Sequence, residues 1–169
     1  MYINVAQLLK EPVGSTRKYN VDEYIGEEGT THVQGKVTVT HTNRSVLVQG
    51  TMNAHGSTIC SRCLEPTEFS VTFTIEDEYF PSIDIVSGLP LPHNPDVYML
   101  DESHVLDLTE TLNQYLAMSM PMKMLCRPDC AGICPSCGQN LNIHICACSE
   151  HSTDPRWSKL VSLKKGGNK

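Results

Sequence analysis

The sequence predicts an α+β fold: an antiparallel β-meander packed by one main helix and followed by a zinc-stapled, cysteine-rich C-terminal segment. Apolar and polar residues alternate over residues 32–80, and apolar residues recur at helical spacing over 106–119. Six of the eight cysteines lie within residues 126–148. We therefore expect a core domain over residues 1–122, which includes the Cys60/Cys63 knuckle. Residues 123–169 would form a zinc-binding segment with a basic C-terminal helix and tail.

The first half of the chain is expected to be mostly strand. Residues 4–9 predict a short helix capped by Asn4 and ended before Pro12, and residues 19–24 are a candidate strand. Valines alternate with polar residues over 33–41, and a second strand is expected from residue 46 to 52. A third strand over residues 68–80 has one apolar and one polar face, which is typical of an antiparallel sheet with one face in water.

The second half begins with a loop over residues 81–95, which is rich in proline. A helix is expected to open at residues 106–110, with Asp107 as its cap and Glu110 at capping-box spacing, and to stop at Pro121. Its apolar stripe would pack on the core; the stripe comprises Leu108, Leu112, Tyr115, Leu116 and Ser119. A last short helix is expected to start at residues 153–155.

The cysteines carry the strongest functional signal. Without an export signal, eight cysteines favour metal ligation over disulfides, and four thiolates complete one structural Zn²⁺ site. The favoured partition gives two Cys₄ sites: Cys60, Cys63, Cys126 and Cys130 in one, and Cys134, Cys137, Cys146 and Cys148 in the other. An alternative joins Cys60/Cys63 with Cys134/Cys137. An iron–sulfur cluster is a second possible occupant, since it uses the same soft ligands, and His144 could replace a thiolate.

Charge divides the chain unevenly. The net charge is −6, which excludes a uniformly basic nucleic-acid binder. Residues 64–122 hold eleven acidic residues and no Lys or Arg, whereas residues 123–169 are net basic. No apolar run reaches the length of a membrane span, and the N-terminus has no signal-peptide pattern, so we expect a cytoplasmic protein without membrane contact.

Candidate RNA contacts are basic residues on or near the cysteine knuckles. Rigid arginine side chains match phosphate oxygens with little ordering cost. The candidates are Arg62, Arg127, Arg156, Lys159, Lys164 and Lys165. The acidic middle would repel RNA and could instead face a basic ribosomal protein. Asp77 would lie on the apolar face of its strand, either at the end of the sheet or as a buried partner for a cation.

No arrangement of catalytic residues is recognisable. The sequence has no Ser/His/Asp order, no phosphate-cradling glycine loop and no HExxH motif, so we predict no catalytic residue and no small-molecule substrate. The carboxylates Glu76, Asp77 and Glu78 could suggest a nuclease, but strand alternation splits them across two faces.

Several motifs together resemble one family. They are CSRCLEP (residues 60–66), LC (125–126) with Cys130, GICPSCGQNLN (132–142), DPRW (154–157) and the N-terminal residues 4–14. In combination they resemble the large ribosomal RNA subunit accumulation protein family (YceD-like). The resemblance implies a non-enzymatic factor in ribosome biogenesis, for accumulation or processing of large-subunit ribosomal RNA, that binds this RNA, a ribosomal protein or an assembly intermediate. The alternatives are a metal-stabilised protein–protein adaptor without RNA contact and an RNA-processing enzyme.

Overall fold

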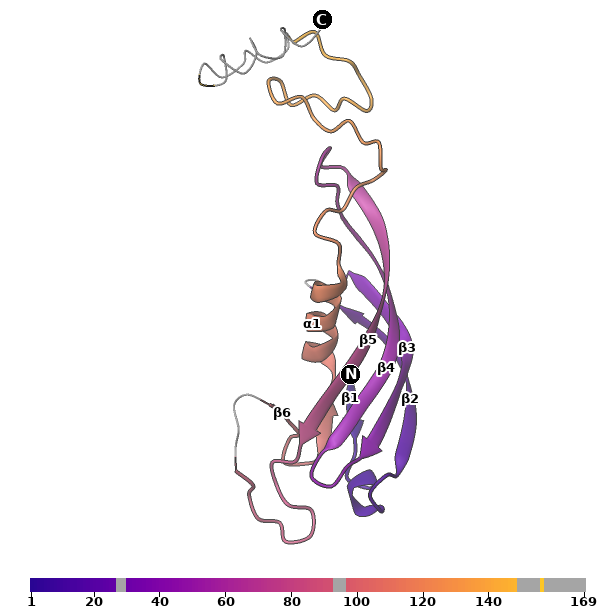
Figure 1. The fold of residues 1–169 in the computed structure, drawn as a ribbon, viewed down its shortest axis with the longest axis vertical. Helices are drawn as coiled ribbons and strands as arrows, with labels where there is room; N and C mark the ends of the chain where they lie inside the picture. The colour runs from indigo at the N-terminus through magenta and orange to yellow at the C-terminus, as the bar shows by residue number, and fades with distance from the viewer. Residues whose placement is uncertain (27–29, 93–96, 149–155, 157–169) are drawn as a thin grey trace, which may run out of the picture.

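The computed structural model describes residues 1–26, 30–92, 97–148 and 156 of the chain. Its main sheet has five strands in the order β2-β3-β4-β5-β6, and α1 lies across one face of this sheet (Figure 1). The strands of this sheet are β2 (Thr16–Ile25), β3 (Thr31–His41), β4 (Val46–Ile59), β5 (Pro66–Phe80) and β6 (Tyr98–Met99). Neighbours from β2 to β5 are antiparallel, which confirms the predicted α+β meander; β6 pairs with β5 in parallel.

The predicted N-terminal helix over residues 4–9 is wrong. Residues Tyr2–Asn4 form β1, which pairs with β7 (Val105–Asp107), and only a short 3₁₀ helix, η1 (Leu8–Lys10), follows. The Asn4 side chain does not cap a helix; its Oδ1 accepts the Ala6 N–H at 3.0 Å in a local turn. Pairing with a segment about a hundred residues later overrides the local helical pattern.

The main helix, α1 (Thr109–Ser119), begins later than predicted because Asp107 belongs to β7. Leu108 holds the cap position and makes no side-chain cap bond. The Asp107 carboxylate still accepts the Thr109 N–H at 2.9 Å, so it satisfies one free donor of the first turn. The expected core stripe is confirmed at Leu108, Leu112 and Leu116, which are buried.

The core lies between α1 and the apolar face of the sheet. Buried valines of β3 and β4 alternate with polar residues, as the sequence predicts, and Met52 fills the centre of this face. Gly35 is paired with Met52, and a Cβ there would lie 2.3 Å from the Thr51 carbonyl oxygen. Only glycine fits this close approach, which allows the long strands to coil around the helix.

The cysteine-rich residues lie at one end of the elongated molecule, beyond the far end of the β4–β5 hairpin (Figure 1). Residues 126–148 contain turns and one isolated bridge, Ile133 with Asn140, but no helix or strand. The described part of the predicted loop, residues 81–92, likewise contains turns and a single bridge, Ile83 with Pro90. The helix predicted to start at residues 153–155 lies outside the described residues.

Candidate metal centre

The cysteines gather into two groups of four, each of which could hold a metal ion. Cys60, Cys63, Cys126 and Cys130 have their sulfur atoms within 4.8 Å of one another, and so do Cys134, Cys137, Cys146 and Cys148. This is the grouping that the sequence favours over the alternative partition. We call the first group the hairpin cluster and the second the terminal cluster.

The spacing of the sulfur atoms in the hairpin cluster fits a tetrahedral ion. The Sγ atoms of Cys63 and Cys126 are 3.7 Å apart, and those of Cys60 and Cys130 are 3.9 Å apart. A tetrahedron with metal–sulfur bonds of about 2.3 Å has edges of about 3.8 Å. Both distances are far longer than the roughly 2.05 Å of a disulfide, and all eight cysteines are free.

The Cys60/Cys63 knuckle connects β4 to β5. Its turn is closed by the Cys60 N–H, which donates to the Glu65 carbonyl at 2.9 Å, and by the Leu64 N–H, which donates to the Cys60 carbonyl at 3.0 Å. Leu64 has a φ of 62°, in the left-handed region that non-glycine residues rarely adopt. The turn holds both cysteine side chains on one side, and both are buried.

The Cys134/Cys137 knuckle repeats this turn at the level of hydrogen bonds. The Cys134 N–H donates to the Gln139 carbonyl at 2.8 Å, and the Gly138 N–H donates to the Cys134 carbonyl at 2.8 Å. Gly138 has a φ of 74° at the position that corresponds to Leu64. This correspondence is not visible in the sequence, because the glycine that signals the turn is present in only one of the two knuckles.

Asn142 links the two clusters, a role that no spacing pattern in the sequence indicates. Its side-chain N–H₂ group donates to Cys130 Sγ at 3.3 Å, and its Oδ1 accepts the Ala131 N–H at 2.8 Å. The same Oδ1 accepts a bond from the Arg127 guanidinium at 2.8 Å. Asn142 therefore orients one ligand of the hairpin cluster from within the loop of the terminal cluster, as an outer-shell residue would.

Electrostatics in each cluster prepare some sulfurs as thiolates. The backbone N–H groups of Cys63, Arg62 and Cys126 lower the pKa of Cys60 to about 6. The backbone N–H groups of Cys137 and Ser136 lower the pKa of Cys134 to about 6. Burial and the neighbouring sulfurs raise the pKa of Cys126 to about 12, and the neighbouring sulfurs raise that of Cys148 to about 12. All four sulfurs of a cluster would become thiolates only with a cation between them, and soft metals suit this donor set.

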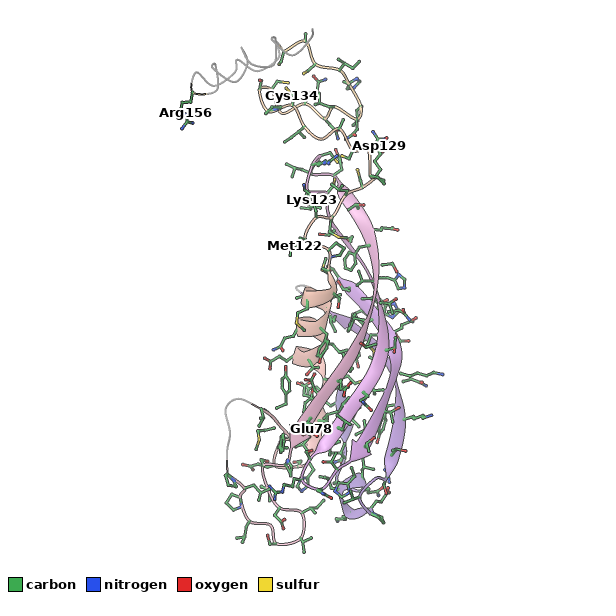
Figure 2. All side chains as sticks on the ribbon, in the orientation of Figure 1. Glu78, Met122, Lys123, Asp129, Cys134 and Arg156 are labelled. Carbon is green, nitrogen blue, oxygen red and sulfur yellow. The ribbon has the colours of Figure 1, made fainter. Side chains whose placement is uncertain are left out.

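The candidate RNA-binding arginines beside the hairpin cluster are exposed, but each is held by polar groups near it. Arg62 Nη1 donates to the Cys130 carbonyl at 2.8 Å, and Arg127 is held by Asn142 and by Asp129, whose Oδ1 lies 3.5 Å from Nε. Arg156 is exposed, while Lys159, Lys164 and Lys165 lie outside the described residues. Figure 2 labels Asp129 and Cys134 at the cysteine-rich end of the molecule.

The carboxylates of β5 are divided as the alternation predicts. Glu76 and Glu78 are exposed on the polar face, whereas Asp77 is half-buried and its Oδ2 has no hydrogen-bond partner among the described residues. Burial raises the pKa of Asp77. No cation partners Asp77 within the described part of the chain. His144, which could have replaced a thiolate, is exposed and outside both sulfur groups.

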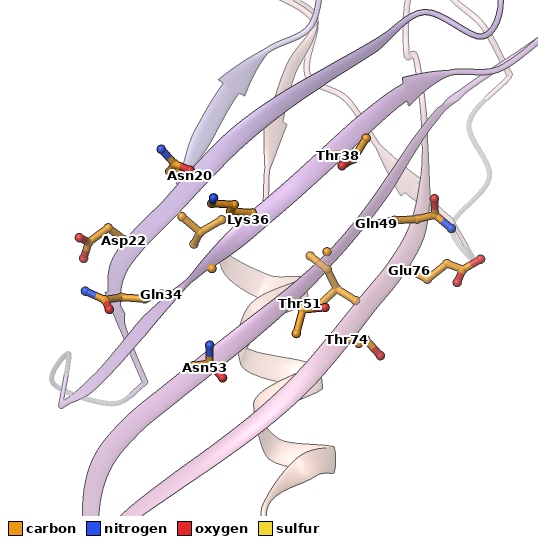
Figure 3. A pocket seen from close by; sticks show the side chains of 14 residues that line it. Asn20, Asp22, Gln34, Lys36, Thr38, Gln49, Thr51, Asn53, Thr74 and Glu76 are labelled. Carbon is orange, nitrogen blue, oxygen red and sulfur yellow. The ribbon is translucent and has the colours of Figure 1, made fainter.

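The polar face of the sheet carries a shallow hollow of about 930 Å³. Its charged lining residues, Asp22, Lys36 and Glu76, come from β2, β3 and β5 (Figure 3). Within the described part of the chain, no hydrogen bond or ion pair joins these three side chains to one another. The remaining labelled side chains are amides and hydroxyls, so the hollow lacks a paired acid and base.

Comparison with known proteins gives one family match. The sequence model described as "Large ribosomal RNA subunit accumulation protein YceD" matches residues 48–164, a segment that contains all eight cysteines. No solved structure matches the chain. None of the described helices is long and apolar enough to cross a bilayer.

Relatives of the chain occur in mycobacteria. Uncharacterized proteins of Mycobacterium tuberculosis and Mycobacterium bovis are 32% identical to it over 121 residues, which is 72% of this chain and 56% of theirs. An uncharacterized protein of Mycobacterium leprae is 26% identical over 122 residues, 72% of this chain and 54% of its own length. The chain thus spans about half the length of these relatives.

Proposed function

Because this chain belongs to the family of the large ribosomal RNA subunit accumulation protein YceD, we propose that it is a non-enzymatic, zinc-binding factor for accumulation of large-subunit ribosomal RNA. The observation that carries the proposal is the position of the cysteines: the segment that matches the family contains both groups of four sulfurs. The factor would act in the cytoplasm by binding the RNA or a ribosomal protein during assembly.

Zinc is the proposed occupant of both clusters. All four donors in each group are cysteine sulfurs, which bind zinc as thiolates, and the two sulfur–sulfur distances of the hairpin cluster match a tetrahedron around Zn²⁺. Four sulfur ligands leave no open position for a reactive water, which is the arrangement of a structural site. Zinc would supply a cross-link that fixes the knuckles, and this role agrees with a family described by accumulation of RNA and not by a reaction.

Two surfaces are available for contact with an assembling subunit. The exposed Arg62 and Arg127 lie beside the hairpin cluster, and Arg156, Lys159, Lys164 and Lys165 add positive charge towards the C-terminus. We assign phosphate contact to these residues because of their charge, and the hydrogen bonds that hold Arg62 and Arg127 reduce the ordering cost of such a contact. The acidic residues 64–122 would repel RNA, so we assign contact with a basic protein to that part of the fold.

The function is tested in a strain that lacks the gene. The ratio of large-subunit to small-subunit ribosomal RNA should fall, and the wild-type chain should restore it. The pairs of substitutions Cys60→Ser/Cys63→Ser and Cys134→Ser/Cys137→Ser separate the contributions of the two clusters. An unchanged ratio in the deletion strain would exclude the proposed function.

The mode of action is tested with purified protein and ribosomal RNA over a series of salt concentrations. Direct contact predicts binding that weakens steeply with salt and falls on Arg62→Ala and Arg127→Ala, while Lys36→Ala in the hollow serves as the matched control. Binding to a ribosomal protein without RNA affinity would favour the adaptor. RNA cleavage that survives repurification would overturn the non-enzymatic function.

A further inference from the structure

The outer edge of β5 is an open strand edge over residues 68–74. β5 lies on the side of the sheet opposite β2, and its pairing with β6 involves only Tyr79 and Phe80 (Figure 1). The Tyr115 hydroxyl, from α1, donates to the Glu76 carbonyl at 3.1 Å and accepts the Glu76 N–H at 3.4 Å. Tyr115 thus covers the edge at Glu76 and leaves the upstream residues uncovered by α1.

The contact with Tyr115 also reveals the direction of the backbone groups. Because both backbone groups of Glu76 point away from β4, and direction alternates along an antiparallel strand, those of Thr74, Thr72, Ser70 and Glu68 point outward too. Within the described ranges, these outward N–H and C=O groups have no hydrogen-bond partner. Val71 and Phe73, in contrast, direct their backbone groups to β4.

The charges along this edge have a single sign. Glu68, Glu76 and Glu78 are exposed on the same face as Ser70, Thr72 and Thr74, and residues 64–122 contain no Lys or Arg. The opposite edge of the sheet, β2, mixes both signs, since it carries Arg17 and Lys18 as well as Asp22 and Glu23. Lysine on an edge discourages pairing with other strands, and the free part of β5 lacks it.

We propose that the β5 edge at residues 68–74 binds an extended, basic segment of a partner protein, which adds to the sheet as a further strand. Alternate basic side chains of the segment would lie beside Glu68 and Glu76, and the intervening apolar side chains would extend the core face next to the half-buried Val71. The inference rests on the proposed function, because it names the surface that holds a basic assembly partner. A second copy of the chain is disfavoured, since antiparallel pairing centred on Thr72 sets Glu68 against Glu76.

The test uses the full chain with zinc and a ten-residue peptide of alternating lysine and valine as the probe. Hydrogen exchange followed by NMR should show slower exchange of the Ser70, Thr72 and Thr74 amides when the peptide is added. The Val71 and Phe73 amides, already bonded to β4, should change little. A peptide of alternating glutamate and valine is the matched control and should give no protection.

Substitutions at the edge separate backbone from side-chain contacts. Thr72→Pro removes an outward N–H without breaking a bond to β4, which an edge strand tolerates, and should weaken peptide binding about tenfold or more. Thr72→Ala loses the 2.8 Å bond to Asn53 but keeps the N–H, so it should bind as the wild type does. If Thr72→Pro does not fold, Glu68→Lys/Glu76→Lys should reverse the preference between the two peptides.

Several results would overturn the proposal. They are unchanged exchange with the basic peptide, equal protection by both peptides, protection by ribosomal RNA, and protection that grows with protein concentration alone. If Thr72→Pro fully restored ribosomal RNA while the cysteine variants did not, the edge would be refuted as a binding surface and the proposed function would stand. Peptide binding at the edge, together with normal ribosomal RNA in the deletion strain, would do the reverse.

Discussion

The two clusters should differ sharply in what they contribute to the stability of the sheet. The hairpin cluster joins Cys63 to Cys126, which are 63 positions apart and lie on either side of β5 and α1. Closing a loop of this length reduces the entropy of the unfolded chain, which raises the free energy of unfolding by about 4 kcal/mol at 25 °C. The terminal cluster spans only residues 134–148, outside the sheet, so its cross-link does not constrain the unfolded core.

We therefore expect Cys60→Ser/Cys63→Ser to lower the free energy of unfolding of the sheet by about 4 kcal/mol, or roughly 2 M in the urea midpoint. Cys134→Ser/Cys137→Ser, the matched control, should change it by less than about 1 kcal/mol. The assay is urea unfolding followed by the far-ultraviolet circular dichroism of the strands, with bound zinc counted by elemental analysis. Each variant should lose one of two zinc equivalents; equal shifts of the midpoint would refute the reasoning.

Three further predictions concern the knuckles and the start of α1. A chelator should remove zinc from the terminal cluster first, because Cys137 and Cys148 are exposed. Hydrogen exchange followed by NMR should then show faster exchange of the Gly138 amide before that of the Leu64 amide. The opposite order would contradict the prediction. Leu64→Gly should stabilise the chain by about 1 kcal/mol in urea unfolding, since it relieves a φ of 62°; a clear loss of stability would contradict it. Burial raises the pKa of Asp107, but the hydrogen bonds from Thr109 outweigh burial and lower the pKa overall, so the ionised carboxylate stabilises the fold above about pH 4 and loses this effect as the pH falls further. Asp107→Asn should remove this part of the pH dependence of stability in an acid titration. An unchanged pH profile of the variant would contradict the prediction.

The meander was predictable because each long strand has one buried face. Alternation locates β3, most of β5 and the first half of β4, where the strand predicted over residues 46–52 continues to Ile59. Beyond Gly56, the β4–β5 hairpin continues with two polar pairs, Ser57 with Glu68 and Thr58 with Thr67, and ends with Ile59 and Pro66, so no alternation of apolar and polar residues marks it. The short strands β1, β6 and β7 carry no period at all, so their pairing could be found only from the tertiary structure.

The candidate metal centre was predictable in its composition more than in its supporting contacts. Spacing of cysteines gave the two groups of four that the fold brings together. The spacing of cysteines does not indicate Asn142, because it bonds to Cys130 from twelve positions along the chain and belongs to no sequence motif for metal ligands. The spacing does not indicate the left-handed conformation of Leu64 either, because leucine is not a residue that signals a positive φ. Asp107 was predicted as the cap of the helix, but it belongs to β7 and Leu108 holds the cap position. Its carboxylate nevertheless accepts the Thr109 N–H in the first turn, as a cap residue would.

The β4–β5 hairpin explains why these features occur together. Its ladder runs from Val46 and Tyr79 in the core to Ile59 and Pro66 at the Cys60/Cys63 knuckle, so it connects the core to the hairpin cluster without a break. Zinc in the hairpin cluster would tie the tip of this ladder to the chain after α1, where the Ser61 N–H donates to the Met124 carbonyl at 2.8 Å. β5 would then be held at its start by the metal and at Glu76 by Tyr115, and its edge would be free between these two points. A rigid open edge loses little entropy when a strand is added, and for this reason removal of the metal should weaken peptide binding at residues 68–74 even though no cysteine touches the peptide.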